Sequence, residues 1–336
     1  MSPLDALPRL PLVNAPTPLQ PAARLSAVLG TEVWFKRDDL TGVGLGGNKV
    51  RALEYLIADA LRDGCDSLVT GAGPQSNWAT LAAVAASRHG LEPHLVYYGP
   101  PVAPVGNHAL AELVGADIRF TGSTERTSVD AGIETLTRDL RARGRRPYAL
   151  PRGGATPLGS IGYLRASGEL ADQFDEAGLK PESVWLATGS CGTQAGLVAG
   201  ARMWGTSYRV TGVSVSRPVT ECAARVTELA DQAGRLAGLT DTGADDVEIL
   251  DGLAGSGYGR PSAAGTEAAR LVARTEGVFL DPVFGAKAMA VLVDRARAGR
   301  QRGPVVFLVS GGAPTLFGSP GTSLPPTPSD SPERRP

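Results

Sequence analysis

The sequence predicts an α/β protein in which parallel sheets are covered by helices on both faces. Short apolar runs alternate with segments of helical periodicity through most of the 336 residues. Such alternation is typical of parallel strands joined by helices. The chain also contains 43 glycines, as expected where many tight turns connect strands to helices.

The expected elements follow one another from residue 67 onward. A proline-rich arm is expected before residue 22, and a disordered tail rich in Pro and Ser at 319–336. Thr127 or Ser128 is expected to cap one helix. Strands are expected at 67–73, 93–99, 117–122, 148–154, 184–190, 208–216, 277–283 and 305–313, and helices at 77–90, 107–116, 127–144, 159–178, 193–205, 220–234 and 286–299.

The overall charge and the cysteines narrow the class of protein. The chain has 33 basic and 34 acidic residues and a net charge of −1, so nothing favours nucleic acid or a membrane surface as a partner. The three cysteines, Cys65, Cys191 and Cys222, have no paired spacing. A reducing cytoplasm fits this pattern better than a disulfide scaffold. No metal-ligand spacing is found among the His and Cys residues.

The glycine-rich segment 42–49, GVGLGGNK, allows three interpretations. A phosphate-binding P-loop is excluded, because Asn48 separates the last glycine from the lysine and Val50 stands where Ser or Thr would hold magnesium. The dinucleotide pattern G-x-G-x-x-G is satisfied, but an apolar strand should precede it, and the preceding WFKRDDLT carries four charges. A nicotinamide dehydrogenase therefore stays open as a weak alternative.

In the third interpretation, Lys49 itself is the reactive group. Apolar residues at 50, 53, 56, 57, 60 and 61 predict an amphipathic helix that begins at Lys49. The helix dipole and partial burial would both lower the pKa of its amine. A neutral lysine is a nucleophile that forms Schiff bases with carbonyl compounds. A solvent-facing lysine at a helix start is the plain alternative.

Several motifs in fixed order resemble those of one enzyme family. They are KRDDLTGVGLGGNKVRALEYL, TGAGPQSNWATLAAVAA, TGSCGTQAGLVAG, GSGYGRP, GVFLDPVFGAKAMA and VVFLVSGGAPTLFG. Together they resemble the pyridoxal-phosphate (PLP) enzymes of the D-cysteine desulfhydrase and 1-aminocyclopropane-1-carboxylate deaminase family, which have the two-domain tryptophan-synthase-β type of fold. The resemblance covers the chain from about residue 18 to residue 318.

The resemblance implies a role for residues in each motif. Lys49 would form the Schiff base with PLP, Asn77 would bind its phenolic oxygen, and Ser310 would face its pyridine nitrogen. A glycine-rich turn into a helix is also a physically sound phosphate site. The implied cofactor-binding residues are Lys49, Asn77, Thr188, Gly189, Ser190, Cys191, Gly192, Thr193 and Ser310. The implied catalytic residues are Lys49, Ser76 and Tyr258, and the implied substrate-binding residues are Ser76, Asn77, Trp78, Tyr258 and Phe284.

Three positions depart from the family pattern. Trp78 stands where relatives have His or Gln, and an indole offers a donor but no acceptor. Phe284 replaces a tyrosine, which removes a hydroxyl and weighs against the cyclopropane-opening reaction. Ala52 replaces a second lysine near the phosphate, and Arg51 is the candidate to compensate for it.

The resemblance implies a PLP-dependent lyase or deaminase that eliminates a β-substituent from a small amino acid to give a 2-oxo acid and ammonia. A synthase, a racemase, a ring-opening deaminase and a PLP-binding protein without turnover stay open as alternatives. The resemblance also implies a homodimer. It implies a larger domain of residues 1–49 and 159–318 and a smaller domain of residues 50–158.

Overall fold

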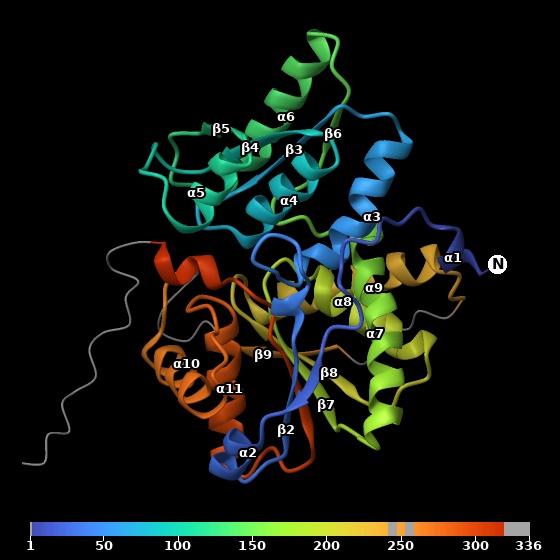
Figure 1. Ribbon diagram of the computed structural model, residues 1–336, viewed down its shortest axis with the longest axis vertical. Coiled ribbons are helices and arrows are strands. Elements are labelled where there is room, and N and C mark those ends of the chain that lie inside the picture. The colour runs from blue at the N-terminus through green and yellow to red at the C-terminus, as the bar shows by residue number, and fades with distance from the viewer. Residues whose placement is uncertain (1, 241–246, 253–258, 319–336) are drawn as a thin grey trace, which may run out of the picture.

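The computed structural model describes residues 2–240, 247–252 and 259–318 and contains two sheets in two lobes (Figure 1). The six-stranded sheet has the order β1-β2-β10-β7-β8-β9, and the four-stranded sheet has the order β5-β4-β3-β6. Every pairing is parallel except that of β1 with β2. The predicted α/β class, with parallel sheets and flanking helices, is confirmed.

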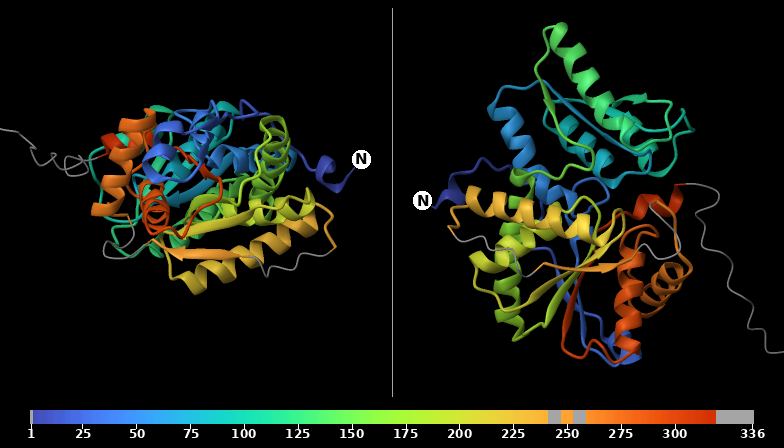
Figure 2. Two further views of the ribbon diagram at one scale, coloured as in Figure 1. Left: turned by 90° about the horizontal axis from the view of Figure 1, so that it is seen from below. Right: turned by 180° about the vertical axis from the view of Figure 1, so that it is seen from behind.

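Helices cover both faces of the six-stranded sheet, with α10 and α11 on one side and α7, α8 and α9 on the other (Figures 1 and 2). In β10, Val305 and Phe307 face the first group while Val306 and Leu308 face the second. Successive side chains of a strand point to opposite faces, so a strand buried on both sides is apolar throughout. The strands are β1 (Leu19–Pro21), β2 (Val33–Lys36), β7 (Ser183–Thr188), β8 (Arg209–Ser214), β9 (Glu248–Asp251) and β10 (Val305–Leu308), and the helices are α2 (Ala23–Leu29), α7 (Pro157–Ala177), α8 (Gly192–Met203), α9 (Val219–Leu236), α10 (Ala263–Glu276) and α11 (Gly285–Arg297).

The four-stranded sheet is likewise buried on two faces. Val69 and Val96 pack against α6, whereas Leu68 faces α3 and α4, and Leu95 faces α4 and α5. The strands are β3 (Ser67–Ala72), β4 (Glu92–Tyr97), β5 (Asp117–Phe120) and β6 (Pro147–Ala149), and the helices are α4 (Asn77–Arg88), α5 (Gly106–Leu113) and α6 (Ser128–Ala142). Short helices lie at α1 (Pro3–Ala6), η1 (Asp38–Leu40) and η2 (Ala313–Phe317).

Helix α3 (Lys49–Arg62) lies between the two lobes and packs against both α4 and α7 (Figure 1). The two sheets use the segments that the sequence assigned to the smaller and larger domains. The boundaries at residues 49 and 159 stay predictions, because α3 makes contacts on both sides.

One local prediction is wrong, and another is confirmed only in part. The segment 277–283 forms no strand, although Val278 and Leu280 are buried. These side chains pack into the apolar cluster around α11, and the Asp281 carboxylate accepts the N–H groups at the start of that helix, so the segment has burial without strand pairing. Thr127 is the N-cap residue of α6, as one of the two predicted candidates, but its side chain makes no capping hydrogen bond.

The predicted tail at 319–336 lies outside the described residues. Within the ranges that the structure describes, no helix is both long and apolar enough to cross a bilayer.

Candidate active site

A cleft lies at the carboxyl ends of the parallel strands, between the two sheets. Residues from just beyond β3, β4, β7, β8 and β10 line it. Ligands of parallel α/β proteins bind at this edge because the loops that follow the strands gather there. The lining residues are Asn48, Lys49, Ala72, Gly73, Ser76, Asn77, Trp78, Tyr98, Arg126, Arg152, Gly153, Ala187, Gly189, Ser190, Ser216, Arg217, Phe284 and Ser310.

Lys49 begins α3, as the helical periodicity predicted, and its side chain lines the cleft. Its Nζ lies 3.5 Å from Ser190 Oγ. Burial lowers the pKa of Lys49 to about 8, and the Cys191 thiol acts in the opposite direction. At neutral pH a usable fraction of this amine is therefore uncharged, which a nucleophile requires.

The glycines before Lys49 allow this loop to approach the loop that follows β10. Gly47 forms a bridge with Gly311, and a Cβ on Gly311 would lie 2.7 Å from Gly47 Cα. The Asn48 N–H donates to Ser310 O at 3.0 Å, which places Lys49 beside Ser310. The last strand before the glycines, β2, ends at Lys36 and is followed by the 3-10 helix η1. The dinucleotide interpretation is therefore wrong, because no strand runs into these glycines.

The loop between β7 and α8 lines one end of the cleft and is a candidate site for an anion. Cys191 is the N-cap of α8 with a φ of 79°, and it turns the chain into the helix. The N–H groups of a first helical turn have no acceptor within the helix, so they are donors for an anion. A second hollow that adjoins Lys49 is lined by Ser190, Gly192, Thr193 and Ala52.

Three neighbouring side chains support this loop. Asn48 donates to Thr193 Oγ1 at 3.0 Å and ties the loop to the residue before Lys49. Thr188 is buried behind the loop, where its hydroxyl donates to Gln194 at 2.7 Å. The Cys191 side chain is buried, with its Sγ 3.6 Å from that of Cys222.

The first turn of α4 forms the opposite wall. Ser76 is the N-cap, and its Oγ accepts the Ala79 N–H at 3.2 Å. Asn107 Nδ2 donates to Asn77 Oδ1 at 2.7 Å, so the Asn77 amide is fixed with its Nδ2 on the side of Gly312. An amide held in this way presents a donor to a ligand.

Trp78 and Phe284 are apolar walls of the cleft. Trp78 Nε1 donates to Thr70 Oγ1 at 2.9 Å, and a Cβ on Gly154 would lie 2.3 Å from the indole. The indole donor is thus used inside the protein. Tyr258, the remaining predicted residue, lies outside the described residues.

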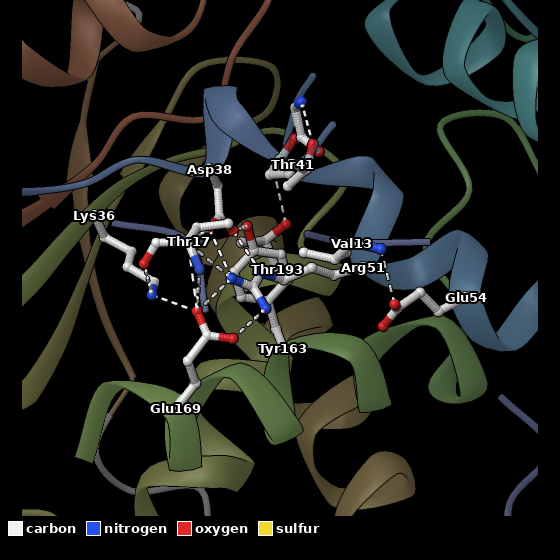
Figure 3. Close-up of polar contacts among 12 residues, drawn as sticks. Val13, Thr17, Lys36, Asp38, Thr41, Arg51, Glu54, Tyr163, Glu169 and Thr193 are labelled. Atoms are coloured by element: carbon white, nitrogen blue, oxygen red, sulfur yellow. Dashed lines mark hydrogen bonds and ion pairs between the residues drawn. The ribbon is translucent and has the colours of Figure 1, made fainter. Parts of the chain in front are cut away.

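Arg51 does not compensate for Ala52, and this expectation is wrong. Its guanidinium lies in a buried network of charges (Figure 3), and Arg51 lines neither the cleft nor the adjoining hollow. Arg51 donates to Asp38 at 2.7 and 2.8 Å and to Glu169 at 2.9 and 3.0 Å. Tyr163 bonds to Asp38, and the Arg51 guanidinium holds the pKa of that carboxyl at about 2 despite its burial.

Sequence reasoning missed several polar residues of the cleft, among them one tyrosine and three arginines. Tyr98 follows β4, and Arg126, Arg152 and Arg217 follow β5, β6 and β8. Each stands in a loop after the carboxyl end of an observed strand, the edge at which ligands of parallel α/β proteins bind. Arg126 and Arg217 also follow predicted strands, so their position was available as a signal, whereas Tyr98 and Arg152 fell inside segments predicted as strands.

Comparisons with known proteins agree with this geometry. The family model described as "Pyridoxal-phosphate dependent enzyme" matches residues 10–311. The D-cysteine desulfhydrases of Salmonella newport (strain SL254) and Salmonella heidelberg (strain SL476) are each 42% identical over 324 residues, covering 94% of this chain and 97% of their own length.

Two solved structures extend the comparison. The crystal structure of an ACC deaminase homologue is 35% identical with a TM-score of 0.87, and the match covers 94% of this chain and 95% of that one. The crystal structure of the threonine deaminase from T.th. has a TM-score of 0.67 at 23% identity, covering 88% of this chain and 92% of that one, and shows the fold alone. The chain belongs to the family of pyridoxal-phosphate dependent enzymes.

Proposed function

We propose that this chain is a lyase that eliminates a β-substituent from a small amino acid and releases a 2-oxo acid and ammonia. One observation carries the proposal: Lys49, with its lowered pKa, lies in the same cleft as the anion-binding loop of α8. The 42% identity to D-cysteine desulfhydrases favours elimination within the family.

The residues of the cleft fit pyridoxal phosphate. Lys49 supplies the amine, the first turn of α8 with Ser190 and Thr193 supplies donors for a phosphate, and Asn77 supplies a donor for a phenolic oxygen. Ser310 offers a hydroxyl rather than a carboxylate to the pyridine nitrogen. When bound, the cofactor withdraws electrons from Cα of an attached amino acid and acidifies its proton.

The chain's own groups would then position the substrate and move the proton. The first turn of α4, with Ser76 as its cap, is a seat for the α-carboxylate, because helix N-termini stabilise anions. Lys49 Nζ would accept the Cα proton as a general base. Trp78 and Phe284 would exclude water from that side of the cleft, and Phe284 has no hydroxyl to add a second proton carrier.

Reductive trapping tests the role of Lys49. The chain has four lysines, Lys36, Lys49, Lys180 and Lys287. The protein would be incubated with PLP, treated with borohydride and digested, and the phosphopyridoxyl group located by mass spectrometry. We expect the label on Lys49, while the exposed Lys180 serves as the internal control for nonspecific reaction. A label distributed over the lysines, or none, would contradict the proposal.

Turnover is tested in the same preparation. D- and L-cysteine and both enantiomers of β-chloroalanine would be added, and 2-oxo acid and ammonia measured. We expect one enantiomeric series to give equal amounts of both products. Trapping at Lys49 without any 2-oxo acid would favour a binding protein or a different specialised reaction.

The homodimer, the cytoplasmic location and the domain boundaries stay predictions. Size-exclusion chromatography with light scattering tests the dimer directly.

A further inference from the structure

Three arginines of the cleft have no part in the proposed elimination. Arg126 follows β5, Arg152 follows β6 and Arg217 follows β8, so three separate loops from both sheets bring them together. All three are partly exposed and line the same cleft as Lys49.

The loops that carry these arginines meet at one place. Arg217 Nε donates to Gly189 O at 3.3 Å, and Arg126 Nη1 lies 3.4 Å from Ser216 O, which it approaches from the other sheet. A Cβ on Gly153, the residue after Arg152, would lie 3.3 Å from Ser190 Cβ. The arginines therefore cluster beside Gly189 and Ser190, at the end of the cleft nearest the α8 loop.

The charge of the cleft is one-sided. Among its described lining residues, Lys49 and the three arginines are cationic, and no carboxylate lines it. Arg152 pairs with Asp130 at 3.1 Å and Arg217 with Glu221 at 2.5 Å, but these carboxylates lie outside the lining and their side chains are 46% and 56% exposed. A cleft lined by one sign of charge attracts ligands of the opposite sign.

The proposed function requires two anions, and each already has another binding site. A cofactor phosphate would lie at the first turn of α8, and a substrate α-carboxylate at the first turn of α4. The three arginines line the main cleft and not the adjoining hollow at Gly192 and Thr193, where that phosphate would lie, so they provide for a further anion. Guanidinium groups bind carboxylate, sulfonate and phosphate oxygens through paired hydrogen bonds.

We infer that the preferred substrate is an amino acid whose side chain carries a second oxyanion, bound by Arg126, Arg152 and Arg217. This inference rests on the proposed function and specifies its substrate class. The side-chain oxyanion would lie at the arginine end of the cleft, with Cα beside Lys49.

Binding of matched ligands tests the inference. Aspartate and asparagine have nearly the same shape but differ by one charge, and calorimetry would measure the affinity of both enantiomers for the holoenzyme. We expect aspartate to bind about tenfold to a hundredfold more tightly in the reactive series. Cysteate and O-phosphoserine extend the comparison to sulfonate and phosphate and identify the oxyanion that fits best. Equal affinity for the charged and neutral ligands would overturn the inference.

Substitutions of the three arginines test whether these residues cause the preference for the charged ligand. In Arg126→Gln, Arg152→Gln and Arg217→Gln, the affinity ratio of aspartate to asparagine should fall toward one, whereas Arg235→Gln, on α9 with a 68% exposed side chain, should leave it unchanged. If the three variants lower PLP affinity and keep the ratio, the arginines serve the cofactor and the inference fails. If Lys49 is labelled and β-chloroalanine yields 2-oxo acid, but charged and neutral ligands bind equally, the inference is refuted and the proposed function stands. If Lys49 is not labelled and no 2-oxo acid forms, the proposed function itself is refuted.

Discussion

The buried network around Arg51 and the cleft around Lys49 both hold cations inside the protein, but their surroundings differ. Lys36 Nζ contacts Glu169, Gln173 and the Thr17 carbonyl. The Arg51 guanidinium contacts the carboxylates of Asp38 and Glu169 (Figure 3). In the cleft, Lys49 lies near a hydroxyl.

This difference separates structural cations from functional ones. Burial lowers the pKa of Lys36, and the carboxylates of Glu169 and Asp38 act in the opposite direction. The pKa of Lys49 is lowered to about 8 with no carboxylate to oppose the effect of burial. A cation whose counter-charge is buried with it joins elements of the fold, whereas one that has no carboxylate among its lining neighbours is available to a ligand.

Replacing Lys49 should have the largest effect. In Lys49→Ala we expect loss of the covalent cofactor and a fall in turnover of about 10³-fold or more, because both the nucleophile and the general base are removed. The cofactor absorbance and 2-oxo acid release measure these losses. The melting temperature of the cofactor-free chain should stay near that of the parent, and Lys180→Ala is the control. Turnover that survives in Lys49→Ala would place the reactive amine elsewhere.

Replacing Lys36 should lower the stability of the fold and leave the reactivity of Lys49 toward the cofactor intact. Lys36→Met keeps the length of the side chain but removes the charge beside Glu169, and breaking a buried pair in this way costs about 3–5 kcal/mol. Urea unfolding of the cofactor-free chain measures the loss. Borohydride should still label Lys49 in the fraction that is folded. A stable variant without labelling would show that the network serves the cofactor rather than the fold.

Local patterns predicted much of this arrangement. The spacing of apolar residues after Lys49 determines a helix within one segment, and α3 begins where it indicates. The alternation of strands and helices predicted the two parallel sheets for the same reason. The strand predicted at 277–283 is not formed, because a run of apolar residues indicates burial and does not specify a strand partner.

The arginine cluster could not be found in this way. Arg126, Arg152 and Arg217 are far apart in the sequence, and the order of strands in two different sheets brings them together. The failure of Arg51 to reach the phosphate loop has the same origin, since Asp38 and Glu169 come from distant segments. Contacts within a segment are predictable from periodicity, whereas charge pairing across segments requires the topology.

The pH dependence of cofactor incorporation should report the unpaired state of Lys49. With a pKa of about 8, the neutral fraction of the amine rises through that pH, so incorporation into the cofactor-free chain should increase about 50-fold from pH 6 to pH 8 and then level off. The sign follows from the nucleophile being the deprotonated form. N-acetyl-lysine in the same buffers controls for titration of the cofactor itself. A rate that is still rising steeply at pH 10 would mean an ordinary lysine pKa and would remove the contrast with Lys36.

Replacing Trp78 should have the smallest effect. Trp78 lines the cleft, but its Nε1 donates to Thr70 Oγ1 inside the protein. Its polar atom is therefore paired within the fold, like the cations of the buried network around Arg51. Trp78→Phe keeps an apolar wall and removes this hydrogen bond, which should cost about 1 kcal/mol of unfolding free energy. Because the indole donor is not available to a substrate, the affinity ratio of aspartate to asparagine should not move. If the ratio changes while stability does not, the indole contacts the substrate, and position 78 belongs with the arginines as a determinant of specificity.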